Sequence, residues 1–411
     1  MSTISTKTSL DNGLTVIHQE MPWLSTVSFS IILPFGTAHE NTGQEGSSVV
    51  LHDWIFRGAE GLSSREISDQ LDNLGSRRGG GTGKELSRFS GSSLSKSFPE
   101  TLEIFAKSLK NPNLTDDEFK SAKLLAEQEL ESLEDNPNQQ LFVELSKQYF
   151  ASSHSNSSYG SSAGLANLQA QELREIFDKY ISPTDAILAV AGGIGQKELI
   201  KEAQKHFSDW KAKNTKTVPV KLKAKSQNHK ILDSNQVQIG ISYPAITPEQ
   251  PGWYENALAV SVLSGGMSAR LFSEVREKRA LVYNVSVFSR VLKKHGYSMA
   301  YAGTSPEKAD ETLEVLTNEL RKLSAGVNKD ELERARIGLQ SQLVMQAESS
   351  SAKASSLAND YYLLGRCRSP EEIITALNGI KLNDLNVFLE GYKPQFRIMS
   401  LGPNELKKVE L

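Results

Sequence analysis

The sequence ETLEIFAKSLKNPNLTDDEFKSAK, residues 100–123, recurs in altered form as ETLEVLTNELRKLSAGVNKDELERAR, residues 311–336. The shared ETLE words start at positions 100 and 311, and each opens a stretch with apolar residues at helical spacing. A loop and an acidic, N-capped turn follow in both copies, at residues 115–118 and 328–331. Matches of this length, with the ETLE words 211 positions apart and the acidic turns 213 apart, indicate an internal repeat.

Offsets of 210 and 212 positions relate other parts of the chain. An alternating strand ends in proline in VSFSIILP, residues 27–34, and again in VQIGISYP, residues 237–244. Tyr180 and Tyr392 close similar helical stretches 212 positions apart. We therefore expect a tandem duplication of an α+β unit. The expected boundaries are an N-terminal half at 1–210, a Lys-rich linker at 211–229 and a C-terminal half at 230–411. We favour a solvated linker over a basic docking patch for the middle segment.

Composition excludes several classes of partner. The 411 residues carry a formal net charge of −3, which gives no reason to expect nucleic acid or an anionic membrane as partner. No apolar run approaches the roughly 20 residues that a membrane helix needs, and the N-terminus lacks the apolar stretch of a signal peptide. The single cysteine, Cys367, excludes an internal disulfide, and we interpret it as a packing thiol. We expect a cytoplasmic protein.

One short helix has the frame of a metal site without its residues. In SSVVLHDWIFRG, residues 47–58, an amphipathic helix places Val49, His52 and Asp53 at i, i+3 and i+4 on one face. Inverted zinc peptidases have H-x-x-E-H at this spacing, where two histidines hold Zn²⁺ and the glutamate is the general base. Here the frame reads Val-Val-Leu-His-Asp.

Two segments carry a family resemblance that extends over nearly the whole chain. ARLFSEVREKRALVYNVSVF, residues 269–288, and GQEGSSVVLHDWIFRGAEG, residues 43–61, resemble the pitrilysin/insulinase-type zinc peptidases, which include the mitochondrial processing peptidase. The resemblance implies two homologous α/β sandwich halves, each an antiparallel-rich sheet covered by helices. In the two-chain bacterial members a second chain of similar size completes the chamber.

The resemblance also assigns the degenerate positions. The first zinc histidine corresponds to Val49, the general base to His52, the second histidine to Asp53 and the third ligand to Glu129. Valine offers no lone pair, whereas a hydrolytic zinc site needs three protein ligands and an open water position. We therefore expect no metal and no independent peptidase activity in this chain. An enzyme with altered metal use through His52, Asp53 and Glu129 remains an alternative.

The first half has lost the family's zinc motif, whereas the second half retains an Arg/Tyr pair of the family. Arg276 and Tyr283, in EVREKRALVY, match a family pair that binds the substrate carbonyl and steadies the oxyanion. A chain with this pair and without the zinc motif resembles the non-catalytic subunit of the two-chain peptidases. The expected partners are a homologous zinc-bearing subunit, which would supply the zinc, and a peptide substrate. A structural or peptide-binding protein of the same fold, with no role in proteolysis, is the alternative.

A glycine-rich segment, GSRRGGGTGKELSRF at residues 75–89, does not fit a phosphate-binding loop. The required earlier glycine is Arg78, and Glu85 stands where Ser or Thr should follow the lysine. The resemblance instead implies that the segment leads into an edge strand that pairs with extended substrate. Its glycines, which would permit close backbone approach, are Gly79, Gly80, Gly81 and Gly83. A mobile surface loop is the alternative.

Overall fold

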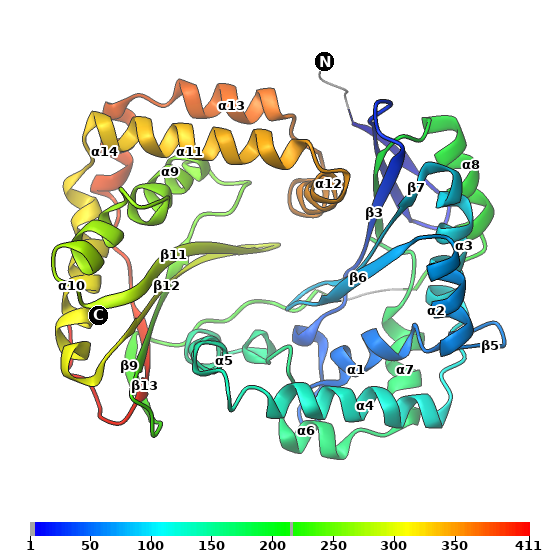
Figure 1. Cartoon of the computed structure of the whole chain (residues 1–411), viewed down its shortest axis with the longest axis horizontal. Helices are drawn as coiled ribbons and strands as arrows, with labels where there is room; N and C mark the ends of the chain where they lie inside the picture. Colours follow the sequence, from blue (N-terminus) through cyan, green and yellow to red (C-terminus); the bar gives the residue numbers. More distant parts are fainter. Residues whose placement is uncertain (1–4, 214–216) are drawn as a thin grey trace. The chain divides into compact units, whose positions relative to one another are not determined.

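The computed structural model describes residues 5–213 and 217–411. Residues 1–4 of the N-terminus and 214–216 of the expected linker lie outside these ranges. The chain divides into two compact units, each with a β-sheet flanked by helices (Figure 1). The first unit comprises Met1–Ser132, Asn156–Pro219 and Gln346–Ser369, and the second comprises Leu133–Ser155, Val220–Met345 and Pro370–Leu411. Among the described residues, no helix combines the length and apolarity required to cross a membrane.

The sheet of the first unit has six strands in the order β1-β2-β8-β3-β7-β6. Only the β2–β8 pair is parallel, and the other pairs are antiparallel. The central strand β3 is apolar along most of its length and is buried at every position except its first. The strands are β1 (Thr6–Ser9), β2 (Thr15–Glu20), β3 (Thr26–Leu33), β6 (Arg77–Thr82), β7 (Ser87–Leu94) and β8 (Ile187–Gly192). A separate hairpin pairs β4 (Gly58–Ala59) with β5 (Leu62–Ser63).

The sheet of the second unit has five strands in the order β11-β12-β10-β13-β9. Its only parallel pair joins β13 and β9. The strands are β9 (Ser226–Ile231), β10 (Val237–Ala245), β11 (Val282–Leu292), β12 (His295–Thr304) and β13 (Arg397–Gly402). Read from β9, this order repeats the order of the first sheet from β2, including the position of the parallel pair.

The duplication expected from the sequence is confirmed at the level of single elements. Strand β3 begins at residue 26 and β10 at residue 237, and helix α3 begins at residue 98 and α10 at residue 309. Both offsets are 211 positions, the spacing of the ETLE words. The α+β class with two homologous halves is therefore the observed architecture.

Helices cover the sheets of both units, and their polar starts follow the capping rules. In the first repeat the Thr115 hydroxyl accepts from the Glu118 amide at the start of α4, and Asn328 and Glu331 cap α11 reciprocally in the second. The helices of the first repeat are α1 (Ser47–Trp54), α2 (Ser64–Asn73), α3 (Phe98–Lys110), α4 (Asp116–Glu131), α5 (Pro137–Tyr149), α6 (Ser162–Asn167), α7 (Ala170–Tyr180) and α8 (Gln196–Phe207). Those of the second are α9 (Trp253–Ser264), the π-helix η4 (Phe272–Glu277), α10 (Ala309–Lys322), α11 (Lys329–Ala347), α12 (Ser350–Leu364), α13 (Pro370–Gly379) and α14 (Leu382–Glu390).

Short 3-10 turns complete the list of elements. They are η1 (Thr37–His39), η2 (Ser95–Ser97), η3 (Ser153–Ser155), η5 (Pro306–Lys308) and η6 (Leu323–Ala325).

Two helices pack on the sheet of the other repeat. Helix α5 belongs by sequence to the first repeat, yet Leu141 and Leu145 pack with Met399 and Leu401 in the second unit. Helix α12 belongs by sequence to the second repeat, and its Leu357 packs in the first unit with residues of β2, β3 and β8. In Figure 1, α12 lies beside β3. Each sheet therefore has both faces covered only because the repeats exchange a helix.

This exchange changes how the expected boundaries are understood. The limits 1–210 and 230–411 refer to the duplicated sequence and stay a prediction. They do not coincide with the compact units, because each unit contains a helix of the other repeat. The expected linker, 211–229, is wrong at its C-terminal end, where β9 begins at Ser226 and pairs with β13. The sequence did not predict β9, because this half-exposed edge strand contains lysine and amide side chains and has no continuous apolar run.

Candidate functional site

Helix α1 presents the degenerate motif on the face that its core residues leave free. Val50, Leu51 and Trp54 are fully buried, whereas Val49, His52 and Asp53 are half-buried on the opposite side. A buried carboxylate that the sequence did not single out, Glu40, holds the start of the helix. It accepts from the amides of Gly46 and Ser48, both at 3.1 Å, and from the Ser48 hydroxyl at 2.6 Å.

The imidazole of His52 is committed to internal contacts. Its Nε2 lies 2.9 Å from the backbone carbonyl oxygen of Arg88, to which it donates. Its ring stacks on Phe89, with 4.4 Å between the ring centroids and 13° between the planes. Burial lowers the pKa of His52, so the neutral ring is favoured. The nitrogen that donates to Arg88 has no lone pair left for a metal ion.

Asp53 has a structural partner on its own helix face. Its carboxylate forms an ion pair with Arg57, one turn later. The same guanidinium reaches the carboxylate of Glu118 in α4 at 3.3 Å, so Arg57 ties α1 to α4. Asp53 therefore has a structural role in holding α1 against α4 through Arg57.

The other two family positions, Val49 and Glu129, also do not fit a zinc site. Val49 has no donor atom, and the Glu129 side chain is exposed near the end of α4. Across residues 5–213 and 217–411, no three side chains of His, Cys, Asp or Glu form a group able to hold a metal ion. The side chains at the four family positions therefore do not fit zinc.

The glycine-rich segment forms the edge strand itself rather than a loop before it. Gly79, Gly80 and Gly81 lie in β6, the outermost strand of the sheet, so the alternative of a mobile loop is wrong for them. Gly83 lies in the turn to β7, where its amide donates to the carbonyl of Leu86 at 2.7 Å. At Gly80 the φ angle is +145°, and a Cβ atom would lie 2.1 Å from the Arg88 carbonyl oxygen. Only glycine fits there without a shift of the strand.

In the second unit, Arg276 and Tyr283 meet on the surface. The Arg276 guanidinium lies over the Tyr283 ring, with 5.0 Å from Cζ to the ring centroid, and also 4.7 Å from the Phe272 ring. The Tyr283 side chain is exposed, at 84% of its possible surface. In the described part of the chain, neither the guanidinium nor the hydroxyl has a hydrogen-bond partner.

Two backbone irregularities position this pair. Arg276 lies in the π-helix η4, a rare conformation that is often found at functional sites. Tyr283 lies in a β-bulge, because Val282 pairs with Thr304 and Asn284 with the next residue, Gly303. A bulge turns a side chain out of the regular alternation of a strand. Sequence periodicity predicted neither feature.

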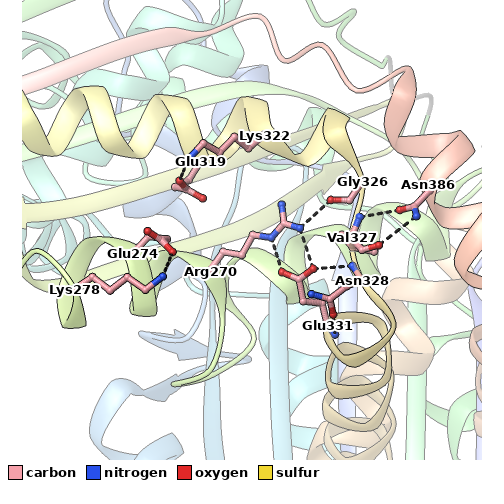
Figure 2. A network of polar contacts seen from close by, with 10 residues as sticks. All are labelled: Arg270, Glu274, Lys278, Glu319, Lys322, Gly326, Val327, Asn328, Glu331 and Asn386. Carbon is pink, nitrogen blue, oxygen red and sulfur yellow. Dashed lines mark hydrogen bonds and ion pairs between the residues drawn. The ribbon is translucent and has the colours of Figure 1, made fainter.

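A polar network fixes the segment that leads into η4. Figure 2 shows Arg270 in a two-pronged ion pair with Glu331, at 2.6 and 2.9 Å, and donating to the carbonyl of Gly326 at 2.8 Å. Glu331 also accepts from the amide of Asn328, so one carboxylate caps α11 and holds Arg270. The contacts of Arg270 therefore anchor the backbone shortly before Arg276.

Cys367 behaves as the packing thiol expected from the sequence. It is half-buried and its Sγ lies 3.5 Å from the carbonyl oxygen of Leu357. Burial raises the pKa of its thiol to about 11, which disfavours the nucleophilic thiolate.

Two family models match most of the chain. Residues 15–161 match insulinase, peptidase family M16, and residues 167–339 match the peptidase M16 inactive domain. The chain belongs to peptidase family M16. The resemblance to insulinase-type peptidases is therefore confirmed. The M16 inactive-domain match begins within the first half and extends to residue 339 in the second, whereas all four altered zinc positions lie in the insulinase match.

Two curated relatives match more than nine tenths of the chain. An uncharacterized zinc protease of Rickettsia felis is 27% identical over 403 residues, covering 97% of each chain. An uncharacterized zinc protease of Bacillus subtilis is 25% identical over 389 residues, covering 93% of this chain and 95% of the relative.

Two crystal structures share the fold of this chain. The peptidase M16 inactive domain of Pseudomonas fluorescens superposes with a TM-score of 0.87 at 20% identity, covering 98% of this chain and 99% of the other. A protease of Helicobacter pylori gives 0.88 at 19% identity, covering 97% and 99%.

Proposed function

We propose that this M16 chain is the non-catalytic subunit of a two-chain zinc peptidase. A homologous partner chain would bring the zinc ion and the general base, and this chain would contribute Arg276 and Tyr283. The observation that carries the proposal is the contrast between the units. Among the described residues, the first unit has no group of side chains able to hold zinc, and the second exposes a cation and a phenol with no internal hydrogen-bond partner.

The chemistry of the pair suits an oxyanion. When a peptide bond is attacked, negative charge develops on the carbonyl oxygen, and preorganised donors aimed at that oxygen lower the barrier. Guanidinium N–H groups and the phenolic O–H are donors whose hydrogen bonds strengthen with that charge. The η4 helix and the bulge fix both groups in advance, so little ordering is needed during the reaction.

The substrate class proposed is an extended peptide or an unfolded segment. Strand β6 pairs with β7 alone among the described strands, so its outer edge presents backbone donors and acceptors. The run Gly79–Gly81, followed by Gly83, lets a second backbone approach closely. We also propose that the complex works in the cytoplasm, which cell fractionation tests.

The alternative is a structural or peptide-binding protein of the same fold without a role in proteolysis. Such a protein would retain the β6 edge but would have no use for an exposed Arg276–Tyr283 pair. Reconstitution decides between the two. We expect peptide cleavage only when this chain is mixed with an M16 chain that retains H-x-x-E-H, and loss of that cleavage in Tyr283→Phe.

A further inference from the structure

Two adjacent arginines open the edge strand β6, and the nearest carboxylate to Arg78, that of Asp53, is already ion-paired with Arg57. Arg77 and Arg78 are both exposed, and within residues 5–213 and 217–411 neither guanidinium has an ion pair. Because successive side chains of a strand point to opposite faces, the two charges lie on opposite sides of the sheet edge. The chain as a whole carries −3, so this edge differs from the average surface.

Arg77 borders a groove lined by hydroxyl groups. It pairs with Ser92 in β7, which in turn pairs with Ser28 in β3, so the three side chains form one row. The Ser28 hydroxyl lies 2.8 Å from those of Ser92 and Ser350, the first residue of α12. The groove has a volume of about 520 Å³, and its lining contains no aspartate or glutamate.

Arg78 borders a smaller pocket on the other face. The pocket measures about 180 Å³ and is lined by His52, Asp53, Phe56, Arg78, Gly79, Gly80 and Phe89. The Arg78 guanidinium lies 4.9 Å from the Phe56 ring centroid. The pocket also holds the Asp53 carboxylate, which forms its ion pair with Arg57 and interacts electrostatically with Arg78. Among the described residues, Arg78 itself forms no ion pair.

The two sites lie at successive positions of one edge. A peptide that pairs with β6 sends its side chains alternately toward the two faces. One side chain then lies over the hydroxyl-lined groove beside Arg77, and the next lies over the small pocket beside Arg78. The glycines that follow have no side chains to obstruct the rest of the peptide.

A third cation extends the same charge along the groove face. Arg88 in β7 pairs with Gly81, two rows from Arg77 on the same face. Its guanidinium contacts only neutral groups, the Ser30 hydroxyl and the side-chain oxygen of Asn359 at 2.6 Å. A basic peptide would therefore be repelled by Arg77 and Arg78 in the edge strand, and Arg88 adds a positive charge in the neighbouring strand.

We propose that the β6 edge selects extended peptide segments with two consecutive acidic residues, one carboxylate directed to Arg77 and the next to Arg78. This selection rests on the proposed binding of substrate at β6 and names its class. Arginine and carboxylate form charge-assisted hydrogen bonds, which are stronger than those between neutral groups.

Direct binding to the full chain, without a partner, tests the selection. Three fluorescent decapeptides that differ only at two central positions, Glu-Glu, Gln-Gln or Lys-Lys, are titrated by anisotropy at low salt. We expect Glu-Glu to bind about tenfold more tightly than Gln-Gln, and Lys-Lys more weakly than both. Arg77→Gln and Arg78→Gln should each remove most of the Glu-Glu advantage and leave Gln-Gln binding unchanged. Arg65→Gln, on α2 beside Asp69, is the matched control.

Each other outcome overturns the proposal. Equal affinity for the three peptides overturns acidic selection, and Glu-Glu binding that survives both arginine substitutions overturns the assigned residues. Absence of binding by every peptide overturns recognition at β6. Because this titration contains no partner chain and reads no cleavage, its result is independent of the test on Tyr283 and the oxyanion.

Discussion

The guanidinium of Arg276 lies over the ring of Tyr283, 5.0 Å from its centroid. Arg276 is in the π-helix η4, and Tyr283 is at the β-bulge of β11. π-Helices and β-bulges are often found at functional sites, and neither side chain adds to the core. Residues that are held in unusual backbone and left exposed are more consistent with a binding role than with folding.

Tyr283→Phe should leave stability unchanged. The Tyr283 hydroxyl has no partner in the described part of the chain, so its loss should change the free energy of unfolding by less than about 0.5 kcal/mol. Tyr301→Phe is the matched control, because that buried hydroxyl donates to Gln238 at 2.7 Å and its loss should cost about 1 kcal/mol or more. Urea unfolding measures both. A large loss in Tyr283→Phe would assign the hydroxyl to the fold.

The purified chain should contain no stoichiometric zinc. Val49 has no donor, the Nε2 of His52 donates to Arg88, and Asp53 is paired with Arg57. Elemental analysis after mild dialysis should find far less than one zinc per chain. An M16 chain with intact H-x-x-E-H, treated in the same way, serves as the positive control. About one retained zinc per chain would favour the enzyme with altered metal use.

Gly80→Ala should destabilise the edge strand. A Cβ atom at this position would lie 2.1 Å from the Arg88 carbonyl oxygen, on a residue with φ +145°. We expect a loss of about 1–3 kcal/mol in the free energy of unfolding, or a shifted β6 with weaker peptide binding. Gly81→Ala is the control, because nothing lies within 4 Å of its Cβ position. Equal effects of the two substitutions would contradict the close approach at Gly80.

The contribution of His52 to stability should fall at acidic pH. Burial lowers its pKa in the folded chain, so below about pH 6.5 the unfolded chain binds a proton there more readily. The stabilising contribution is therefore present above that pH and is lost as the pH decreases. His52→Gln removes the titrating group and retains a donor for Arg88. The difference in unfolding free energy between wild type and variant should shrink between about pH 8 and about pH 5.5. A constant difference would contradict a neutral, buried His52.

Much of the fold follows from the sequence, because the repeat controls the strand order. The ETLE words and the proline-ended strands locate equivalent elements, and the structure confirms their offset. The exchange of α5 and α12 was not predictable, because the apolar residues of a helix do not specify which of two sheets it covers. Only the tertiary packing decides which sheet each covers.

The candidate site was predictable in its residue types and not in its geometry. The spacing of Val49, His52 and Asp53 correctly predicted a shared helix face. The stack of His52 on Phe89 and the bridge from Arg57 to Glu118 join segments far apart in sequence, which periodicity does not report. The bulge at Tyr283 depends on the register with β12, which is likewise a tertiary property.

The turnover number of the reconstituted complex with Tyr283→Phe is the most direct test of the proposed function. The complex is assembled from this chain and an M16 chain of the same genome that retains H-x-x-E-H, and assembly is checked by sedimentation. Loss of one oxyanion donor should lower kcat for a quenched peptide about 100- to 1000-fold, with assembly unchanged. Tyr301→Phe, whose hydroxyl already has an internal acceptor, should retain kcat. An unchanged kcat in Tyr283→Phe would contradict a composite active site that uses this phenol.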